Sequence, residues 1–566
     1  MKKNLPVVTL TTAVLLVILL CRVPSAGAQE PHEHHHDSSE KLGRVNFNVS
    51  CTPEAQKLFN RAVAWLHSFE YEEAERAFAE VTATDPRCGM GYWGVALSNY
   101  HPLWAPPTAA ELQKGARAVE QAKSIGARTQ RERDYISAVE LFYKDSDKLD
   151  HRTRALAYGE AMGQLSRRYP SDSEAEVFYA LTLIAKGMMA HDKSYASEKE
   201  AARILNRVLA REPQHPGVTH YVIHSYDYPA LANLALPAAR SYAKIAPASA
   251  HARHMPSHIF TRLGLWQESI QSNLGAKAAA EAFAIRNRMP GAWDEQLHAM
   301  DYLAYAYLQG AQDEHARGVL DELNRIRQVE PETFKVAYAA TAIPARYALE
   351  RRRWNAAAEL TMHDGTLGTF PWENFRWAVA HIYFARAVGA ARSGDVASAR
   401  REVEKLAAIR QALVEVKGGY DWATQVEIER QVAAAWLAHA EGGREESLRL
   451  MRAAAELDDS TEKHPVTPGA LLPAREQLGE LLLELKELAA ALREFEASLR
   501  NAPNRFNGLY GAARSAALAG DRKTAEGYYK QLVALCRHAD TNRPELSEAK
   551  EFLAGGSAAA SQMRVR

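Results

Sequence analysis

Apolar residues recur at helical spacing along most of the chain, with polar residues between them. The clearest stretches are 108–124, 294–309, 332–350, 374–393, 395–412, 421–440 and 444–457. No segment shows the sustained period-two alternation of apolar and polar residues that a half-buried strand needs. The pattern therefore predicts an all-α chain made of many short helices.

A second regularity places a large apolar residue four positions after a small residue, and a proline eight positions later. It occurs at Ala74, Phe78 and Pro86, and again at Ala491, Phe495 and Pro503. Related triplets begin at Ala201 and at Ala235, which are 34 residues apart. This pattern and period are typical of the tetratricopeptide repeat, a helix–turn–helix unit that buries its apolar face by stacking. We therefore expect an all-α tetratricopeptide-repeat superhelix, or solenoid.

The N-terminus has the pattern of a secretory signal. Lys2 and Lys3 precede an apolar run over 5–20, and the small residues 26–28 form an A-x-A cleavage site. We expect cleavage at about residue 28, a periplasmic or secreted protein, and no integral membrane segment after cleavage. Cys21 would suit a lipoprotein, but the residue before it, Leu20, is not small.

The domain organisation follows from these patterns. We expect a signal peptide at 1–28, a flexible His-rich tail at 29–44, a repeat superhelix at 45–360, further repeats at 361–554 and a flexible tail at 555–566. Residues 32–37 contain a literal H-E-x-x-H, but this signature works only on an ordered helix beside a cleft. A metal-capturing or merely solvated tail suits this polar segment better.

Charge and motifs exclude several functions. Lys+Arg and Asp+Glu are 69 each, so there is no charge excess to favour nucleic acid. The chain lacks a P-loop, a dinucleotide-binding glycine motif, G-x-S-x-G and C-x-x-C. Nucleotide binding, serine-hydrolase chemistry and thioredoxin-like redox chemistry are therefore unsupported.

The cysteines suggest one disulfide. Cys51 stands just before the first predicted helix and Cys88 just after the second. An antiparallel helix pair returns its end near its start, so an oxidising compartment would allow the two to bridge. This pairing would leave Cys536 alone. The alternative is two buried free thiols.

Two pairs of histidines repeat at the same interval. His220 and His254 are 34 residues apart, and so are His224 and His258. Equivalent positions in successive repeats lie side by side, so the four rings should form a ladder. Within each pair, residues four apart share one helical face. Pro256 should kink its helix or begin a new one, which would distort the ladder.

The sequence also resembles a family of exported bacterial tetratricopeptide-repeat proteins. The resemblance rests on an H-x-x-H-M-P-S-H-I-F-x-R-x-G-x-W motif from His251, on K-H-P-V-T-P-G at 463–469, and on the segments 45–51, 59–62, 92–94, 101–104, 220–227 and 473–476. It implies the fold and names no activity. Repeat domains of this type present certain positions of each unit to a concave groove. In units starting at 216 and 250, those positions are His220, His224, Asp227, His251, His254 and His258; the next helix adds His298 and Asp301.

This face has three interpretations. His220, His224, His254 and His258 suit a divalent transition metal, zinc or copper, because neutral imidazole is a common ligand. The residues could instead contact a protein, peptide or small molecule in the groove, or they could be hydrogen-bonded structural groups. The leading functional hypothesis is an exported scaffold that binds a partner in its groove, through a metal if one is present. The alternative is a metal-dependent, hydrolase-type enzyme with Asp227, Asp301 or Glu295 as base.

Overall fold

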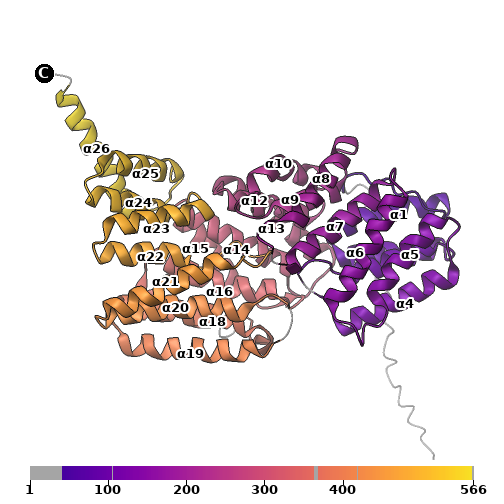
Figure 1. The fold of residues 1–566 in the computed structure, drawn as a ribbon, viewed down its shortest axis with the longest axis horizontal. Helices are drawn as coiled ribbons and strands as arrows, with labels where there is room; N and C mark the ends of the chain where they lie inside the picture. Colours follow the sequence, from indigo (N-terminus) through magenta and orange to yellow (C-terminus); the bar gives the residue numbers. More distant parts are fainter. Residues whose placement is uncertain (1–40, 105, 191, 363–366, 417–418, 564–566) are drawn as a thin grey trace, which may run out of the picture. The chain divides into compact units, whose positions relative to one another are not determined.

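The computed structural model describes residues 41–563, apart from 105, 191, 363–366 and 417–418. The described chain is all-α (Figure 1). Its first section contains α1 (Pro53–His67), α2 (Tyr71–Thr84), α3 (Gly89–Ser98), α4 (Ala109–Ile125), α5 (Gln130–Tyr143), α6 (His151–Arg168), α7 (Ser173–Ala190) and α8 (Ala196–Arg211).

The middle section carries the histidine-rich segments. It contains α9 (Pro216–Tyr226), η1 (Ala232–Ala235), α10 (Leu236–Ile245), α11 (Ala250–His254), α12 (Pro256–Arg262), α13 (Trp266–Arg286), β1 (Ala292–Trp293), α14 (Asp294–Gln309), α15 (Asp313–Leu323), β2 (Val329–Glu330), α16 (Phe334–Leu349) and α17 (Trp354–Ala358). The β1–β2 pair is parallel and only two residues long, so it is a local bridge between loops.

The last section continues the helix pairs. It contains η2 (Trp372–Phe375), α18 (Arg376–Ser393), α19 (Val396–Val414), α20 (Trp422–Ala440), α21 (Arg444–Ser460), α22 (Ala474–Glu484), α23 (Leu488–Asn501), α24 (Phe506–Leu518), α25 (Arg522–Leu535) and α26 (Pro544–Met563). Successive helices pack on each other along this section. The helical stretches predicted from periodicity are confirmed: 294–309 coincides with α14, and 108–124 is displaced by one residue from α4.

The prolines of the repeat pattern mark where one unit ends and the next begins. Helices α3, α9, α11 and α24 each begin three residues after Pro86, Pro213, Pro247 and Pro503 respectively. Proline lacks the backbone N–H that a continuing helix would use, so the chain turns there. The described residues thus form an all-α array of tetratricopeptide-type helix pairs, as the sequence predicts.

The large residue of the pattern fills the space between units. A Cβ added to Gly94 of α3 would lie 2.2 Å from the Phe78 ring of α2. A Cβ added to Gly511 of α24 would lie 2.2 Å from the Phe495 ring of α23. Each glycine stands 16 residues after its phenylalanine. The same close packing of ring on backbone therefore recurs at both ends of the described chain.

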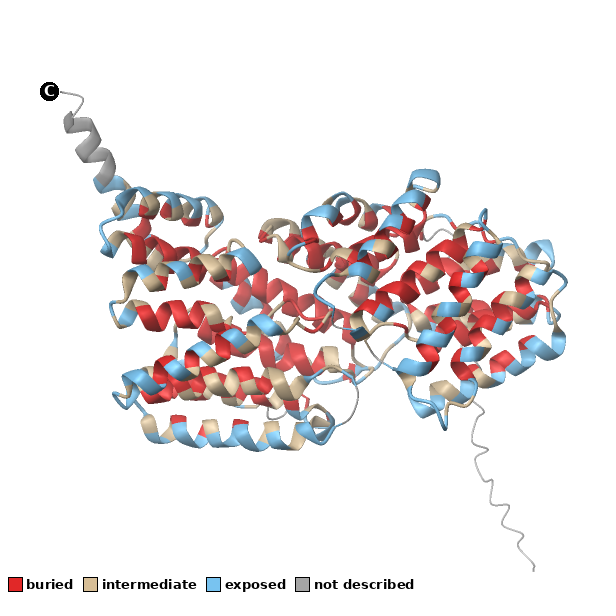
Figure 2. Cartoon of the chain, in the orientation of Figure 1, coloured by how far each residue is buried: buried red, intermediate tan, exposed pale blue. Residues whose placement is uncertain are grey.

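Burial varies strongly among the helices (Figure 2). Every residue of α14 is buried, and this helix packs against α11, α13, α15 and α16. By contrast, α19 buries only Ala399, Glu402 and Leu406. Since α14 carries His298, one of the sequence-predicted site residues stands on the most enclosed helix of the middle section.

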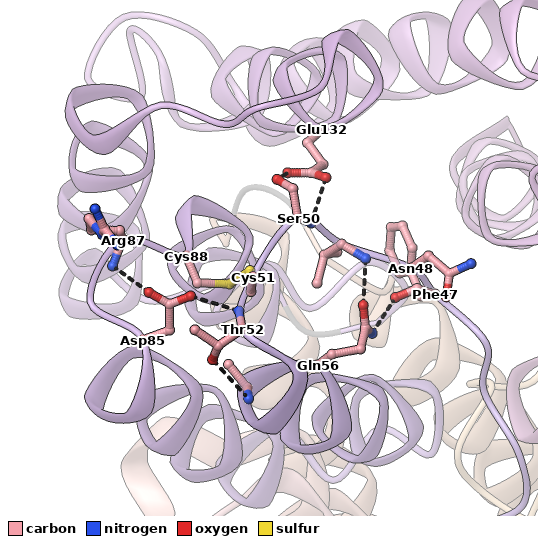
Figure 3. The surroundings of a disulfide bond; sticks show 12 residues. Phe47, Asn48, Ser50, Cys51, Thr52, Gln56, Asp85, Arg87, Cys88 and Glu132 are labelled. Carbon is pink, nitrogen blue, oxygen red and sulfur yellow. Dashed lines mark hydrogen bonds between the residues drawn. A yellow bond between two sulfur atoms is a disulfide. The ribbon is translucent and has the colours of Figure 1, made fainter.

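Cys51 and Cys88 form a disulfide that closes the first helix pair (Figure 3). Their sulfurs are 1.96 Å apart and their Cα atoms 5.1 Å apart. Around the bridge, Asp85 accepts hydrogen bonds from the backbone N–H groups of Thr52 and Arg87. The bridge ties the start of α1 to the turn after α2, and Cys536 is a buried free thiol.

The predictions for the chain ends are only partly open to inspection. The signal segment 1–28 and the histidine tract 32–37 lie outside the described residues. Residues 41–44, assigned from sequence to a flexible tail, pack instead: Leu42 is buried, and Arg44 N–H donates to the Gln214 carbonyl. Helix α26 continues beyond residue 555, where a tail was expected, and the flexibility of that end stays a prediction. In the described part of the chain, no helix has the length and apolar character needed to cross a bilayer.

Candidate metal centre

Four short helical segments bring six histidines together. Helix α9 carries His220 and His224, α11 carries His251 and His254, α12 carries His258, and α14 carries His298. Pro256 separates α11 from α12 at the first turn of the new helix, where its missing N–H is not needed. The intervening Met255 keeps right-handed helical angles, so the break leaves both His254 and His258 on helical turns.

The first three rings form one group, called here the first triad: His220, His224 and His251. The Nε2 atom of His220 lies 3.0 Å from Nε2 of His224 and 3.2 Å from Nε2 of His251. One ligand nitrogen from each residue lies within 4.8 Å of the others. The first triad therefore joins two helices, α9 and α11.

The other three rings form the second triad: His254, His258 and His298. The Nε2 atoms of His254 and His258 are 3.0 Å apart, and the ring centroids of His254 and His298 are 4.1 Å apart. Their ligand nitrogens also lie within 4.8 Å of one another. The ladder predicted from the 34-residue interval is thus regrouped. Each set of three takes one i, i+4 pair and adds a histidine from a neighbouring helix.

Three rings are oriented by hydrogen bonds on the far side from the cluster. The Nδ1–H of His220 donates to the His67 carbonyl at 2.7 Å, and that of His258 donates to Asp227 at 3.0 Å. The Nδ1–H of His254 donates to the Asn273 side-chain oxygen at 2.7 Å. Such bonds set the tautomer and leave Nε2 as the acceptor.

The Asn273 contact is itself unambiguous. Its amide nitrogen donates to the Ser269 carbonyl at 2.8 Å, so its oxygen must face His254. With Nδ1 of His254 and of His258 both committed as donors, each neutral ring presents a lone pair at Nε2. Those two lone pairs face each other across 3.0 Å. A cation or a shared proton has to lie between them.

Burial disfavours a protonated ring. The six histidines are at most 7% exposed. Burial lowers the pKa of His220 to about 3, and it lowers the pKa of His258 as well. For His224, His251, His254 and His298, burial and then the neighbouring imidazoles hold the pKa well below its ordinary value. The rings are therefore neutral at physiological pH, which is the form that ligates metals.

The two triads share one region of space. The rings of His224 and His258 approach to a centroid distance of 6.4 Å, and those of His251 and His254 to 6.3 Å. Within the second triad, the His258 and His298 centroids are 6.5 Å apart. Rings from different triads are therefore as close as some rings within one triad.

A cavity of about 280 Å³ adjoins the cluster. It is lined by His251 of the first triad and by His258 and His298 of the second. Its walls also carry Glu70 and Glu295. Glu295 accepts a hydrogen bond at 2.7 Å from Lys335, while Glu70 accepts hydrogen bonds from Ser249 and from the His251 backbone N–H. The cavity therefore combines imidazole edges with carboxylates.

Aromatic side chains cover the first triad. The Phe69 ring lies 4.4 Å from the His220 ring and 5.6 Å from the His224 ring, centroid to centroid, and Trp104 lies 5.4 Å from His224. These two residues come from the N-terminal helix pairs. The histidines consequently lie in a buried cluster beside a small cavity, whereas the sequence placed them on an open concave groove.

The predicted carboxylates have different surroundings. Asp227 holds His258 and also accepts a hydrogen bond from Arg262 at 2.9 Å. Asp301 forms a buried ion pair with Arg346 at 2.5 Å. Near the second triad, the Tyr302 hydroxyl lies 3.4 Å from Nε2 of His258 and donates to the Val466 carbonyl at 3.0 Å. Asp227 thus orients a ring, while Asp301 belongs to another network.

A third cluster, which the sequence did not single out, has saturated hydrogen bonds. Glu174 accepts from Nε2–H of His67 at 2.8 Å and from Nε2–H of His215 at 2.9 Å. The remaining ring nitrogens accept from the Tyr221 hydroxyl and the Val218 N–H. Every ligand atom here has a partner, so this cluster is structural. His67 and His215 have no repeat partner in the sequence that could have indicated it.

Comparisons with known proteins add little to this description. No family model and no curated protein matches the sequence. Among solved structures, yeast Tom70 is 12% identical with a TM-score of 0.32, over 91% of this chain and 97% of that chain. The Cut9 and Hcn1 hetero-tetramer of APC/C gives 10% and 0.32 over 88% and 83%. The P58(IPK) TPR domain gives 14% and 0.22 over 69% and 99%. At these values the likeness carries no functional argument, and the class, an all-α tetratricopeptide-type repeat protein, rests on the repeat and packing described above.

Proposed function

We propose that this protein binds transition-metal ions through its six-histidine cluster and presents them to a small ligand in the adjoining cavity. The observation that carries the proposal is the 3.0 Å approach of the His254 and His258 Nε2 atoms, with both Nδ1 atoms already committed as donors. A divalent ion between the lone pairs removes their repulsion and uses both as ligands.

The donor geometry supports this proposal. Ligands about 2.0–2.1 Å from a tetrahedral zinc stand about 3.3 Å apart, close to the distances within the two triads. Hydrogen bonds from ligand imidazoles to a carboxylate, an amide oxygen or a backbone carbonyl raise ligand basicity and hold each ring in place. His258, His254 and His220 have one such partner each.

The size of the cavity favours a small ligand over a protein partner. About 280 Å³ is near the lower end of the range for small-molecule sites. Three histidines per ion leave a coordination position free, and the cavity contacts both triads. A bound metal ion would therefore meet its ligand there.

A metal-dependent hydrolase is a second candidate. It is favoured by Glu295, which lines the cavity one helical turn before His298 and is a carboxylate of the kind that serves as general base to a metal-bound water. Its ion pair with Lys335 would have to loosen for that role. Turnover of substrate by the metal-loaded protein would distinguish the two candidates.

We also propose that the protein works outside the cytoplasm. The signal-like N-terminus predicts export, and the bridge between Cys51 and Cys88 suits an oxidising compartment. Detection of the mature chain, beginning near residue 29, in a periplasmic or culture-medium fraction would test this proposal.

The metal proposal is tested by elemental analysis. The mature protein is incubated with Zn²⁺ or Cu²⁺, desalted and analysed by mass spectrometry of the metals. We expect stoichiometric metal in the wild type and loss of the second-triad ion in His254→Ala with His258→Ala. The matched control is His381→Ala, a buried histidine outside both triads that is bonded to Thr341.

Circular dichroism shows whether each variant keeps its helices. A wild-type protein that holds no metal after desalting contradicts the proposal. So does a folded double variant that retains the full metal content.

A further inference from the structure

We infer that the two triads hold two copper ions as one coupled pair, with their free coordination positions turned toward a shared ligand. This inference rests on the proposed function and specifies the metal, the number of ions and their relation. It is carried by the donor set, by the proximity of the triads and by the cavity that reaches both.

The donors of both triads are neutral nitrogens only. Among the described residues, each candidate metal group in this region consists of three histidines and no carboxylate. The nearest carboxylate, Asp227, bonds the Nδ1 side of His258, away from Nε2. Imidazole sets suit zinc, copper, iron and nickel, whereas magnesium and calcium require oxygen ligands. The donor set therefore restricts the choice to late transition metals.

Burial then favours the ion of lowest charge. Two divalent ions on six neutral donors would place a large positive charge among groups at most 7% exposed. Copper is the metal in this group with a stable monovalent state, which halves that charge. Copper(II) also stands highest in the affinity order for divalent ions at nitrogen sites. Both oxidation states of copper are thus favoured over zinc.

Proximity makes the two ions a pair. The closest rings of different triads are 6.3 and 6.4 Å apart, centroid to centroid, and no described side chain separates His251 from His254 in the ring contacts of α11. Each ion lies beyond Nε2 of its three rings, on the side of the cluster. A hydroxide derived from water can therefore bridge two copper(II) ions and couple their electron spins.

The cavity is the place where the shared ligand enters. It touches His251 of the first triad and His258 and His298 of the second. A ligand in this cavity can reach the free position of both ions at once. Aromatic residues Phe69 and Trp104, also on its lining, restrict it to small molecules.

Electron paramagnetic resonance tests the pair directly. Metal-free mature protein is loaded with Cu²⁺ and desalted, and its copper content and spin count are measured on the same sample. We expect two copper ions per chain, one for each triad, with loss of most of the copper signal through coupling. His224→Ala breaks the first triad, and we expect one copper per chain with the full signal of one isolated ion.

His298→Ala breaks the second triad and should give the same result, while His381→Ala should behave as wild type. Should a variant not fold, the spin count of the wild type still decides the matter. Two copper ions with two full spins per chain would show isolated sites and overturn the inference. Zinc displacing copper in an equimolar competition would overturn it too, while leaving the proposed metal function intact. Absence of all metal would refute both.

Discussion

At the residue scale, similar side chains have opposite roles in two neighbouring clusters. In the cluster of His67, Glu174 and His215, each ring nitrogen faces a complementary partner. In the second triad, Nε2 of His254 faces Nε2 of His258, so two acceptors meet. The difference lies in which atom of each ring is already used. The first arrangement is complete with protein atoms alone, and the second requires a cation.

The saturated cluster gives a stability prediction. Glu174→Gln replaces a buried carboxylate by an amide, whose nitrogen would face a ring N–H. We expect the free energy of unfolding of the metal-free protein at pH 7 to fall by about 2 kcal/mol, as for loss of a hydrogen bond to a charged group. Urea denaturation measures it. The control Glu268→Gln, which removes an exposed pair with Arg240, should change little.

The sign of its pH dependence follows from the pKa of Glu174. Burial raises this pKa, but the interactions with His215 and His67 outweigh burial and hold it below its ordinary value of 4.5. A depressed pKa contributes stability above the unfolded value, and that stability is lost as the pH falls below it. The gap between wild type and Glu174→Gln should therefore be constant near neutrality and should narrow below about pH 4.5. A gap that widens in acid would contradict the ionised carboxylate.

At the scale of the elements, the units are defined by where a helix can end and how closely the next can approach. Proline ends a unit, and the next helix begins three residues later. The phenylalanine of one helix then packs against the glycine of the following helix, at Phe78 with Gly94 and at Phe495 with Gly511. Because glycine has no side chain, the ring can lie directly on the backbone. Close approach of successive helices in turn positions the rings of α9, α11 and α14.

Alanine substitutions test this close packing. Gly94→Ala and Gly511→Ala place a methyl group 2.2 Å from a phenylalanine ring. We expect each to lower the free energy of unfolding by about 1–3 kcal/mol through overpacking. Gly318→Ala, in helix α15 with open space around it, should instead raise it by about 0.5–1 kcal/mol because glycine weakens a helix interior. Thermal unfolding of the three variants measures both signs, and equal effects at all three sites would refute the argument.

At the scale of the whole described chain, one segment links repeats that are distant in the sequence. Residues 463–469 connect α21 to α22 and contact three earlier helices. The Val466 carbonyl accepts from Tyr302 of α14, and the Gly469 carbonyl accepts from Tyr338 and Arg346 of α16. Lys463 lies 3.5 Å from Asp227. The C-terminal repeats therefore help to close the surroundings of the second triad.

Arg346 is the central cation of this link, and its removal should be costly. It is fully buried and pairs with Asp301, which is 2% exposed. Arg346→Met leaves that carboxylate without its cation, so we expect a loss of about 3–5 kcal/mol in the free energy of unfolding. Asp301→Asn in the same chain should recover part of the loss. The surface control Arg240→Met should have little effect, and a single variant as stable as wild type would contradict the coupling.

Much of the fold could be predicted from the sequence, because helical period and unit-ending prolines are local properties. They placed α14 within its observed bounds and predicted the Cys51–Cys88 pair, since both depend on residues close in the chain. The broken helix at Pro256 was likewise foreseen as one of two outcomes. Burial of the histidines could not be predicted, because Phe69 and Trp104 reach them from other helix pairs.

The sequence by itself determined which histidines recur on one helical face, because the 34-residue interval and the i, i+4 spacing are written in the chain. Only the tertiary structure decided their grouping. It added His251 to the first triad and His298 to the second, and it supplied Asn273 and the His67 carbonyl to orient the rings. The physical reason is that periodicity gives the direction of a side chain around its own helix. The rotation of a ring and the identity of its partner depend on how separate helices pack.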